Sequence, residues 1–245
     1  MVAKSALCVA ALAALSAVAG QNASAAVIPV TSYNADGIVQ NGSANANNEG
    51  EIVVGQFSTN HRVVVYPFQL PTLAPGEVVT DASLKVVYRA NLGTENFNVD
   101  VYAVDVNASN AISNGYYGVG ASPTTPTGSV LIQDNFVTPT TTIGNVTSNA
   151  TAGANLAAYL NQPGKYVAGS YVWLRLNFDV AQGSEVGQYK FGANDFGGGT
   201  ATTAGSIPAV LTLTTAIPEP ATVFVLAGVA GVLGLSRRRR PAGVK

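Results

Sequence analysis

Apolar and polar residues alternate through the middle of the chain, most clearly around its single tryptophan. Five apolar residues there share one face of the pattern: Val172, Leu174, Leu176, Phe178 and Val180. Five larger or more polar residues share the other: Tyr171, Trp173, Arg175, Asn177 and Asp179. Successive side chains of a strand point to opposite faces of a sheet, so the first set is expected in the core and the second pointing outward.

The same kind of pattern predicts further strands between residues 27 and 216. The expected strands are 28–33, 51–57, 62–70, 78–89, 97–105, 129–136, 171–180, 189–192 and 209–215. In 97–105 the outward positions include Asp100 and Tyr102. Gly, Asn, Pro and Thr punctuate these runs. Asn41–Gly50 and the segment around Asn145 are expected to be polar loops or turns.

One helix is predicted at 153–161, because Leu156, Tyr159 and Leu160 share a helical face and Pro163-Gly164 follows. Many short strands with one helix predict an all-β domain. The expected architecture is an antiparallel two-sheet sandwich of the jelly-roll kind.

The first 26 residues are typical of a secretory signal peptide. Lys4 precedes an apolar run, and Ala23-Ser24-Ala25 supplies the small residues that signal peptidase requires, so cleavage is expected after Ala25 or Ala26. The alternative is an uncleaved anchor helix. Cleavage removes the only cysteine, Cys8, so the mature chain cannot form disulfides.

Residues 217–245 form a second targeting segment. Pro218-Glu219-Pro220 is followed by an apolar stretch that predicts a short transmembrane helix, and then by Arg237, Arg238, Arg239 and Arg240. The positive-inside rule places these arginines in the cytoplasm and the domain outside. A permanent tail anchor is the plainer alternative.

This order of motif, apolar stretch and arginine cluster resembles the PEP-CTERM sorting signal of Gram-negative bacteria. The resemblance implies a transient membrane anchor that an exosortase cuts near Pro218-Glu219-Pro220. It also implies a final location at the cell surface or in the extracellular matrix, in bacteria that make exopolysaccharide.

The composition excludes several classes of protein. Residues 27–216 hold six basic and twelve acidic residues, which disfavours nucleic-acid binding. The only histidine is His61 and the only cysteine is Cys8, so a Cys/His zinc site lacks ligands. A serine triad would have to use His61, and the sequence contains no G-x-S-x-G motif. No catalytic residue and no cofactor is predicted.

A second resemblance rests on the spacing of hydrophobic residues. Val65-Tyr66-Pro67-Phe68-Gln69-Leu70, Val99-Asp100-Val101-Tyr102, 155–160 and Pro208-Ala209-Val210-Leu211-Thr212-Leu213 are similar to strands and the helix of disaggregatase-related (DNRLRE-type) domains. That family implies an extracellular sandwich like a carbohydrate-binding module, and it supplies no catalytic residues.

The outward face of the Trp173 strand is the one candidate ligand site. Tyr102, Tyr171 and Trp173 beside Arg175 and Asn177 could form a sugar platform, because aromatic rings stack on sugars and polar groups bind their hydroxyls. The alternative is a sheet face covered by a loop, such as 106–128.

Two weaker hypotheses concern carboxylates. Asp100 and Asp179 fall on one face of the expected sheet, but no motif selects them as a glycosidase pair. Asp105, Asn107 and Ser109 offer oxygens at alternate positions, as a calcium loop does, but the pattern departs from an EF-hand and an ordinary Asx-rich turn is the favoured explanation.

The sequence thus predicts a non-catalytic structural protein of the cell surface or exopolysaccharide matrix. A carbohydrate-binding module is the first alternative and a glycoside hydrolase a remote one. The predicted partners are signal peptidase, an exosortase and extracellular polysaccharide, with no nucleic acid.

Overall fold

The strands and the helix come from a computed structural model, which describes residues 26–32, 36–41, 43–46, 51–57, 60–93, 97–117, 129–179, 187–193 and 208–218. The signal residues Ala23 and Ala25, the transmembrane stretch and the arginines 237–240 lie outside these residues. Within them, Ala26–Thr215 forms one unit by its internal contacts.

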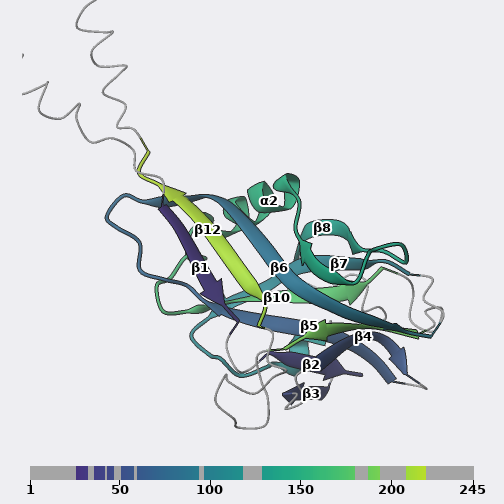
Figure 1. Ribbon diagram of the computed structural model, residues 1–245. Coiled ribbons are helices and arrows are strands. Elements are labelled where there is room, and N and C mark those ends of the chain that lie inside the picture. The colour runs from purple at the N-terminus through teal and green to yellow at the C-terminus, as the bar shows by residue number, and fades with distance from the viewer. Residues whose placement is uncertain are drawn as a thin grey trace, which may run out of the picture. The chain divides into compact units, whose positions relative to one another are not determined.

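Twelve strands form a single sheet, and the strand pairs observed in it are antiparallel (Figure 1). They are β1 (Ala26–Thr31), β2 (Gly37–Gln40), β3 (Ser43–Ala46), β4 (Glu51–Phe57), β5 (Asn60–Gln69), β6 (Val78–Leu92), β7 (Val99–Asn107), β8 (Val130–Val137), β9 (Gly144–Thr147), β10 (Tyr171–Phe178), β11 (Gly187–Gly192) and β12 (Val210–Ala216). The main order is β1-β12-β6-β11-β4-β5-β10-β7-β8, with β2 and β3 attached to β5 and β9 to β6.

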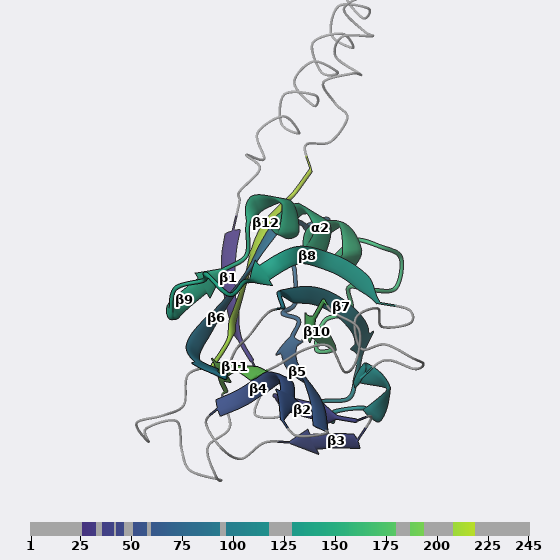
Figure 2. The ribbon, with the colours of Figure 1, turned by 90° about the vertical axis from the view of Figure 1, so that its right-hand side faces the viewer.

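The sheet curls, so that strands distant in this order lie against each other. β1, at one end of the order, contacts β5, which lies five places along it. Figures 1 and 2 show β1, β12 and β6 running together at an angle to β5. The β7–β10 pairing shifts register between Trp173 and Leu174, and the β6–β11 pairing shifts between Lys190 and Phe191. Such irregularities increase the local twist and bend of a sheet.

A chain of aromatic rings fills the interior of this curl. The ring of Tyr189 on β11 lies 5.7 Å from Tyr88 on β6 and 5.0 Å from Phe97, and Phe97 lies 5.9 Å from Phe178 on β10. The pairs are edge-on, an arrangement that contributes about 0.5–1.5 kcal/mol beyond the burial of area. The rings thereby join strands from opposite parts of the sheet.

The predicted helix is present and longer than expected. α2 (Ala150–Leu160) begins at its cap Asn149, whose side chain accepts a hydrogen bond from the Ala152 N–H at 2.8 Å. Leu156, Tyr159 and Leu160 are buried, as their spacing predicts, and the helix packs on β6 and β8. The helix starts before the expected residue 153 because Asn149 caps it.

The all-β class is confirmed, but two parts of the prediction change. The hydrogen-bonded path is continuous, so the structure shows one curled sheet, and a division into two sheets is not confirmed. β3 and β9 lie in segments expected to be polar loops or turns, and β2 was not among the expected strands. Gln40 pairs with Ser43, and Asn41 after Gln40 has a φ of 47°, so part of the expected loop 41–50 belongs to a hairpin.

The part of the chain that the structure describes contains no helix with the length and apolar character of a membrane span. Its one α-helix, α2, has 11 residues.

Candidate functional site: the covered face of β10 and the end of β12

The residues of the expected sugar platform do come together in the fold. Tyr171, Trp173, Arg175 and Asn177 lie along β10, and Arg175 pairs directly with Tyr102 of β7. None of them is exposed, however. Trp173, Arg175 and Asn177 have 0% of their surface accessible, and Tyr102 and Tyr171 have 8% each. As an exposed platform, the prediction is therefore wrong.

The segment between β7 and the short 3-10 helix η1 (Asn114–Tyr117) covers this face. The Trp173 indole N–H donates to the Ser109 carbonyl at 3.3 Å, and the Tyr116 ring lies 4.9 Å from the Trp173 ring. The structure thus shows a loop over this face of the sheet, which was the alternative to a sugar platform. Sequence alternation alone did not identify it because it cannot show whether a second layer covers a sheet face.

Arg175 fastens this covering segment. Its Nη1 donates to the carbonyls of Tyr116 and Tyr117 at 2.6 and 2.7 Å, and its Nη2 donates to the side chain of Asn177. Burial lowers the pKa of Arg175 to about 9, although the tyrosines Tyr102 and Tyr117 act in the opposite direction. The guanidinium therefore remains charged at neutral pH, and it holds the 3-10 turn on β10.

Three aspartates lie near one end of this face. Asp100 on β7 is 5% exposed and accepts the Asn135 N–H at 2.8 Å. Burial raises the pKa of Asp100 to about 6; the Asn135 N–H opposes this rise, and the nearby Asp134 and Asp179 add to it.

Asp179 has a different role from Asp100. It accepts both the backbone and the side-chain N–H of Asn98, at 3.0 and 2.9 Å, so it clasps the end of β10 to the start of β7. Neither described cavity is lined by these aspartates.

The oxygens of the proposed calcium loop accept hydrogen bonds from their own turn. Asp105 Oδ1 accepts the Val106 N–H, Asn107 Oδ1 accepts the Ser109 N–H, and Ser109 Oγ accepts the Ala111 N–H, at 2.8, 2.9 and 3.1 Å. The bonds of Asn107 and Ser109 reach the N–H two residues on, as in Asx and Ser turns. The described residues contain no group of three or more His, Cys, Asp or Glu side chains suited to a metal ion.

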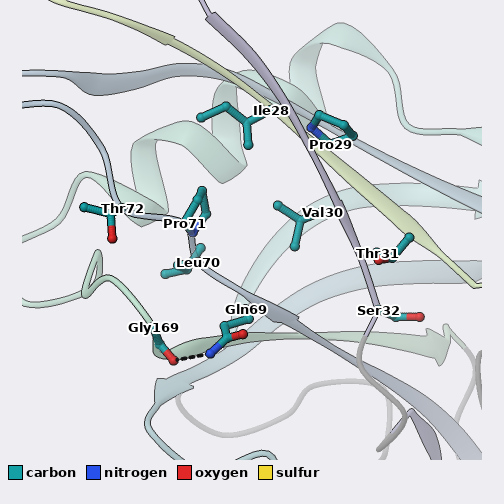
Figure 3. Close-up of a pocket in the computed structure, with 10 residues that line it drawn as sticks. All are labelled: Ile28, Pro29, Val30, Thr31, Ser32, Gln69, Leu70, Pro71, Thr72 and Gly169. Atoms are coloured by element: carbon teal, nitrogen blue, oxygen red, sulfur yellow. Dashed lines mark hydrogen bonds between the residues drawn. The ribbon is translucent and has the colours of Figure 1, made fainter.

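A cavity of about 650 Å³ lies between β1 and the end of β5 (Figure 3). Ile28 and Val30 point from β1 toward Leu70 and Pro71, and Gln69 closes one side by donating to the Gly169 carbonyl at 3.1 Å. The ten lining residues include neither a charged side chain nor an aromatic ring. This cavity therefore lacks the stacking surface on which sugar recognition usually depends.

The other candidate region is the end of β12, where the targeting segment begins. β12 lies between β1 and β6, its inward residues Leu211, Leu213 and Thr215 are fully buried, and it ends at Ala216. Pro218 is exposed and is the last described residue, so Glu219 and Pro220 lie outside the description. Ala26, the first described residue, pairs with Thr215 at the same end.

The comparisons with known proteins concern this end of the chain. Residues 216–240 match the family model of the PEP-CTERM protein-sorting motif. No curated protein matches the sequence. The motif implies secretion, a transient membrane anchor and processing by an exosortase.

Proposed function

We propose that this protein is a non-catalytic structural component of the extracellular matrix or exopolysaccharide layer of a Gram-negative bacterium. Signal peptidase removes residues 1–25, an exosortase removes the C-terminal anchor, and the β domain remains at the cell surface. The observation that supports this proposal is the match of residues 216–240 to the PEP-CTERM sorting motif, which starts at the last residue of β12.

The junction between domain and motif agrees with such a role. Ala216 ends β12, and Pro218-Glu219-Pro220 begins two residues later. Pro218, two residues after the end of β12, is exposed and cannot donate a ladder hydrogen bond. The first residue of the motif therefore offers no backbone donor with which to extend the strand.

The features of the domain itself also favour a structural role over recognition. The aromatic residues of the expected sugar platform are buried, Trp173 among them under the 107–117 segment, and the cavity beside β1 contains no aromatic residue. The resemblance to DNRLRE-type domains remains a prediction, and it is compatible with either role.

Processing is tested by the intact mass of the protein recovered from the cell surface. We expect wild-type protein to have lost Arg237–Arg240. Replacing Pro218, Glu219 and Pro220 by alanine should retain the arginines. The matched control Pro241→Ala, which changes a proline beyond the apolar stretch, should behave as wild type. Arginines retained in the wild type would show that the segment is a permanent anchor.

The role is tested with the purified mature protein and the host's own exopolysaccharide. We expect retention in the matrix fraction without saturable binding of isolated polysaccharide and without release of sugar. Saturable binding would indicate a carbohydrate-binding module, and sugar release a hydrolase. Trp173→Ala is unsuitable as a probe of binding, because Trp173 is fully buried and its loss destabilises the fold.

A further inference from the structure

The two ends of the β domain meet in one strand pair. β1 and β12 are antiparallel, and Ala26 lies opposite Thr215. The Ser32 N–H donates to the carbonyl of Ala209, its direct partner, at 2.9 Å. Since hydrogen-bonded pairs recur at every second residue of an antiparallel ladder, Ala26, Ile28 and Val30 direct their backbone groups to β12. The first residue after the predicted cleavage site is thus already part of the sheet.

The Thr215 side chain connects this residue to a carboxylate. Its hydroxyl oxygen lies 3.5 Å from the Ala26 carbonyl oxygen and donates its proton to Oε1 of Glu77. Oε2 of Glu77 accepts the Ala74 N–H at 2.8 Å. The bonds from Thr215 and Ala74 lower the pKa of Glu77, so this side chain is an anion at neutral pH.

Three oxygens therefore gather at the start of β1, those of the Ala26 carbonyl, the Thr215 hydroxyl and the Glu77 carboxylate, and the hydroxyl supplies one proton. The bonds from Thr215 and Ala74 lower the pKa of Glu77 and desolvation raises it, and no lysine or arginine of the described part of the chain is among these causes. A small cation with several N–H groups suits such a set of acceptors.

We propose that Glu77 and Thr215 form the receiving site for the α-ammonium group that signal peptidase creates on Ala26. Hydrolysis of the bond between Ala25 and Ala26 consumes one water. The new carboxylate leaves with Ala25, and the new amine stays on Ala26, protonated at neutral pH. One of its three N–H groups keeps the ladder bond to β12, and the others face the Thr215 hydroxyl and the Glu77 carboxylate.

This site links the two processing events that the proposed function requires. Cleavage creates a positively charged α-ammonium group at the start of β1. This group binds Thr215, the last buried residue of β12, and so connects the two strands. The strand that carries the sorting motif is thereby fixed on its β1 side after signal-peptide removal. The inference rests on the proposed export, and it specifies cleavage after Ala25 rather than after Ala26.

The test measures the reactivity of the α-amine in mature protein recovered from the cell. An amine reacts with an acylating reagent only when it is deprotonated, so an ion pair slows the reaction. Exposed ion pairs contribute about 0.2–1 kcal/mol, and the amine of Glu77→Gln should therefore react up to about fivefold faster than that of wild type. Glutamine removes the charge; its one oxygen can still accept the Ala74 N–H, and its amide N–H can donate to the Thr215 hydroxyl oxygen.

Asp81→Asn is the matched control, because Asp81 is an exposed carboxylate on β6, the same strand that follows Glu77. We expect its amine to react at the wild-type rate. Raising the salt concentration to about 1 M, where the Debye length is about 3 Å, should bring the wild-type rate toward that of Glu77→Gln. This salt effect needs no variant and tests the site even if Glu77→Gln fails to accumulate.

Three results would overturn the proposal: a mature chain that does not begin at Ala26, equal rates for wild type and Glu77→Gln, or the same acceleration in Asp81→Asn. None of these results depends on the fate of Arg237–Arg240. Failure of this site is therefore distinguishable from failure of exosortase processing.

Discussion

The buried carboxylate of Asp100 predicts that the domain becomes more stable under mild acid. Asp100 is 5% exposed, and burial is the main reason that its pKa rises from 3.8 to about 6. Because the folded pKa lies above the unfolded one, the native state binds the proton more tightly. Protonated Asp100 makes its full contribution to the free energy of unfolding below about pH 4, and this contribution is lost as the pH rises through about 6.

The size of the effect follows from the shift. One pH unit corresponds to about 1.4 kcal/mol, so the upper limit at neutral pH is about 3 kcal/mol. Solvent near this end of the β7–β8 pair screens the charge and lowers the expected value to about 1–2 kcal/mol. Asp100→Asn removes the ionisation, and its Oδ1 still accepts the Asn135 N–H, so the variant should be more stable by this amount at about pH 7.5.

Urea unfolding followed by the fluorescence of Trp173 measures this difference, since Trp173 is the only tryptophan. We expect the advantage of Asp100→Asn to fall by about half between about pH 7.5 and pH 5, because the wild-type carboxyl regains its proton over that range. The other titrating groups are the same in both proteins, so their contribution cancels when the wild-type free energy of unfolding is subtracted from that of the variant. Asp81→Asn, an exposed carboxylate, should change stability little at either pH. A destabilised Asp100→Asn at about pH 7.5, or an advantage independent of pH, would refute the reasoning.

Three further substitutions test other parts of the fold. Gly153→Ala should lower the free energy of unfolding by about 1–2 kcal/mol, although alanine has the better helix propensity. The reason is that the new Cβ would lie 2.5 Å from the Ala82 carbonyl oxygen and in contact with Asp81. Ala154→Gly, at an exposed neighbouring position, measures the effect of helix propensity alone. Arg175→Met should lower the free energy of unfolding by about 3 kcal/mol and speed proteolysis within 107–117, because the carbonyls of Tyr116 and Tyr117 lose their buried donor. Unchanged proteolysis would show that Arg175 does not hold this segment on β10. Pro29→Thr should cause concentration-dependent association in light scattering, because it adds an N–H to the open edge of β1; a variant that stays monomeric would show that Pro29 does not protect this edge.

The edge positions illustrate how the sheet limits its own growth. β1 and β8 end the main strand order. Val27, Pro29 and Thr31 direct their backbone groups away from β12, and proline has no N–H to offer there. On β8, Asn135 has a φ of 55° and the pairing with β7 is irregular, which interrupts a regular row of donors and acceptors. Pro29 therefore removes one donor from the outer side of β1, and the irregular pairing bends β8.

The sequence by itself determined the strands whose pattern is strong. The bounds expected for β4 agree with the structure, and the inward residues Leu174, Leu176 and Phe178 are fully buried, because period-two alternation reflects burial on one face. The sorting motif was also recognisable, because a linear signal depends on residue order and not on folding.

Other local features also have a signal in the sequence. Asn149 is a helix cap, and Asn41 begins a two-residue hairpin turn; both are asparagine signals within segments that were interpreted only as polar. These errors concern local chemistry, and the sequence contained the information needed to avoid them.

Only the tertiary structure decided what covers each face of the sheet. The pattern placed Trp173, Arg175 and Asn177 opposite the core residues, and that part was correct. Whether this face meets solvent depends on the 107–117 segment, which is distant in the sequence and is fastened by bonds from Arg175 and Trp173. The meeting of Ala26, Glu77 and Thr215 has the same origin: residues far apart in the chain become neighbours only when β1 pairs with β12, and no local pattern encodes that pairing.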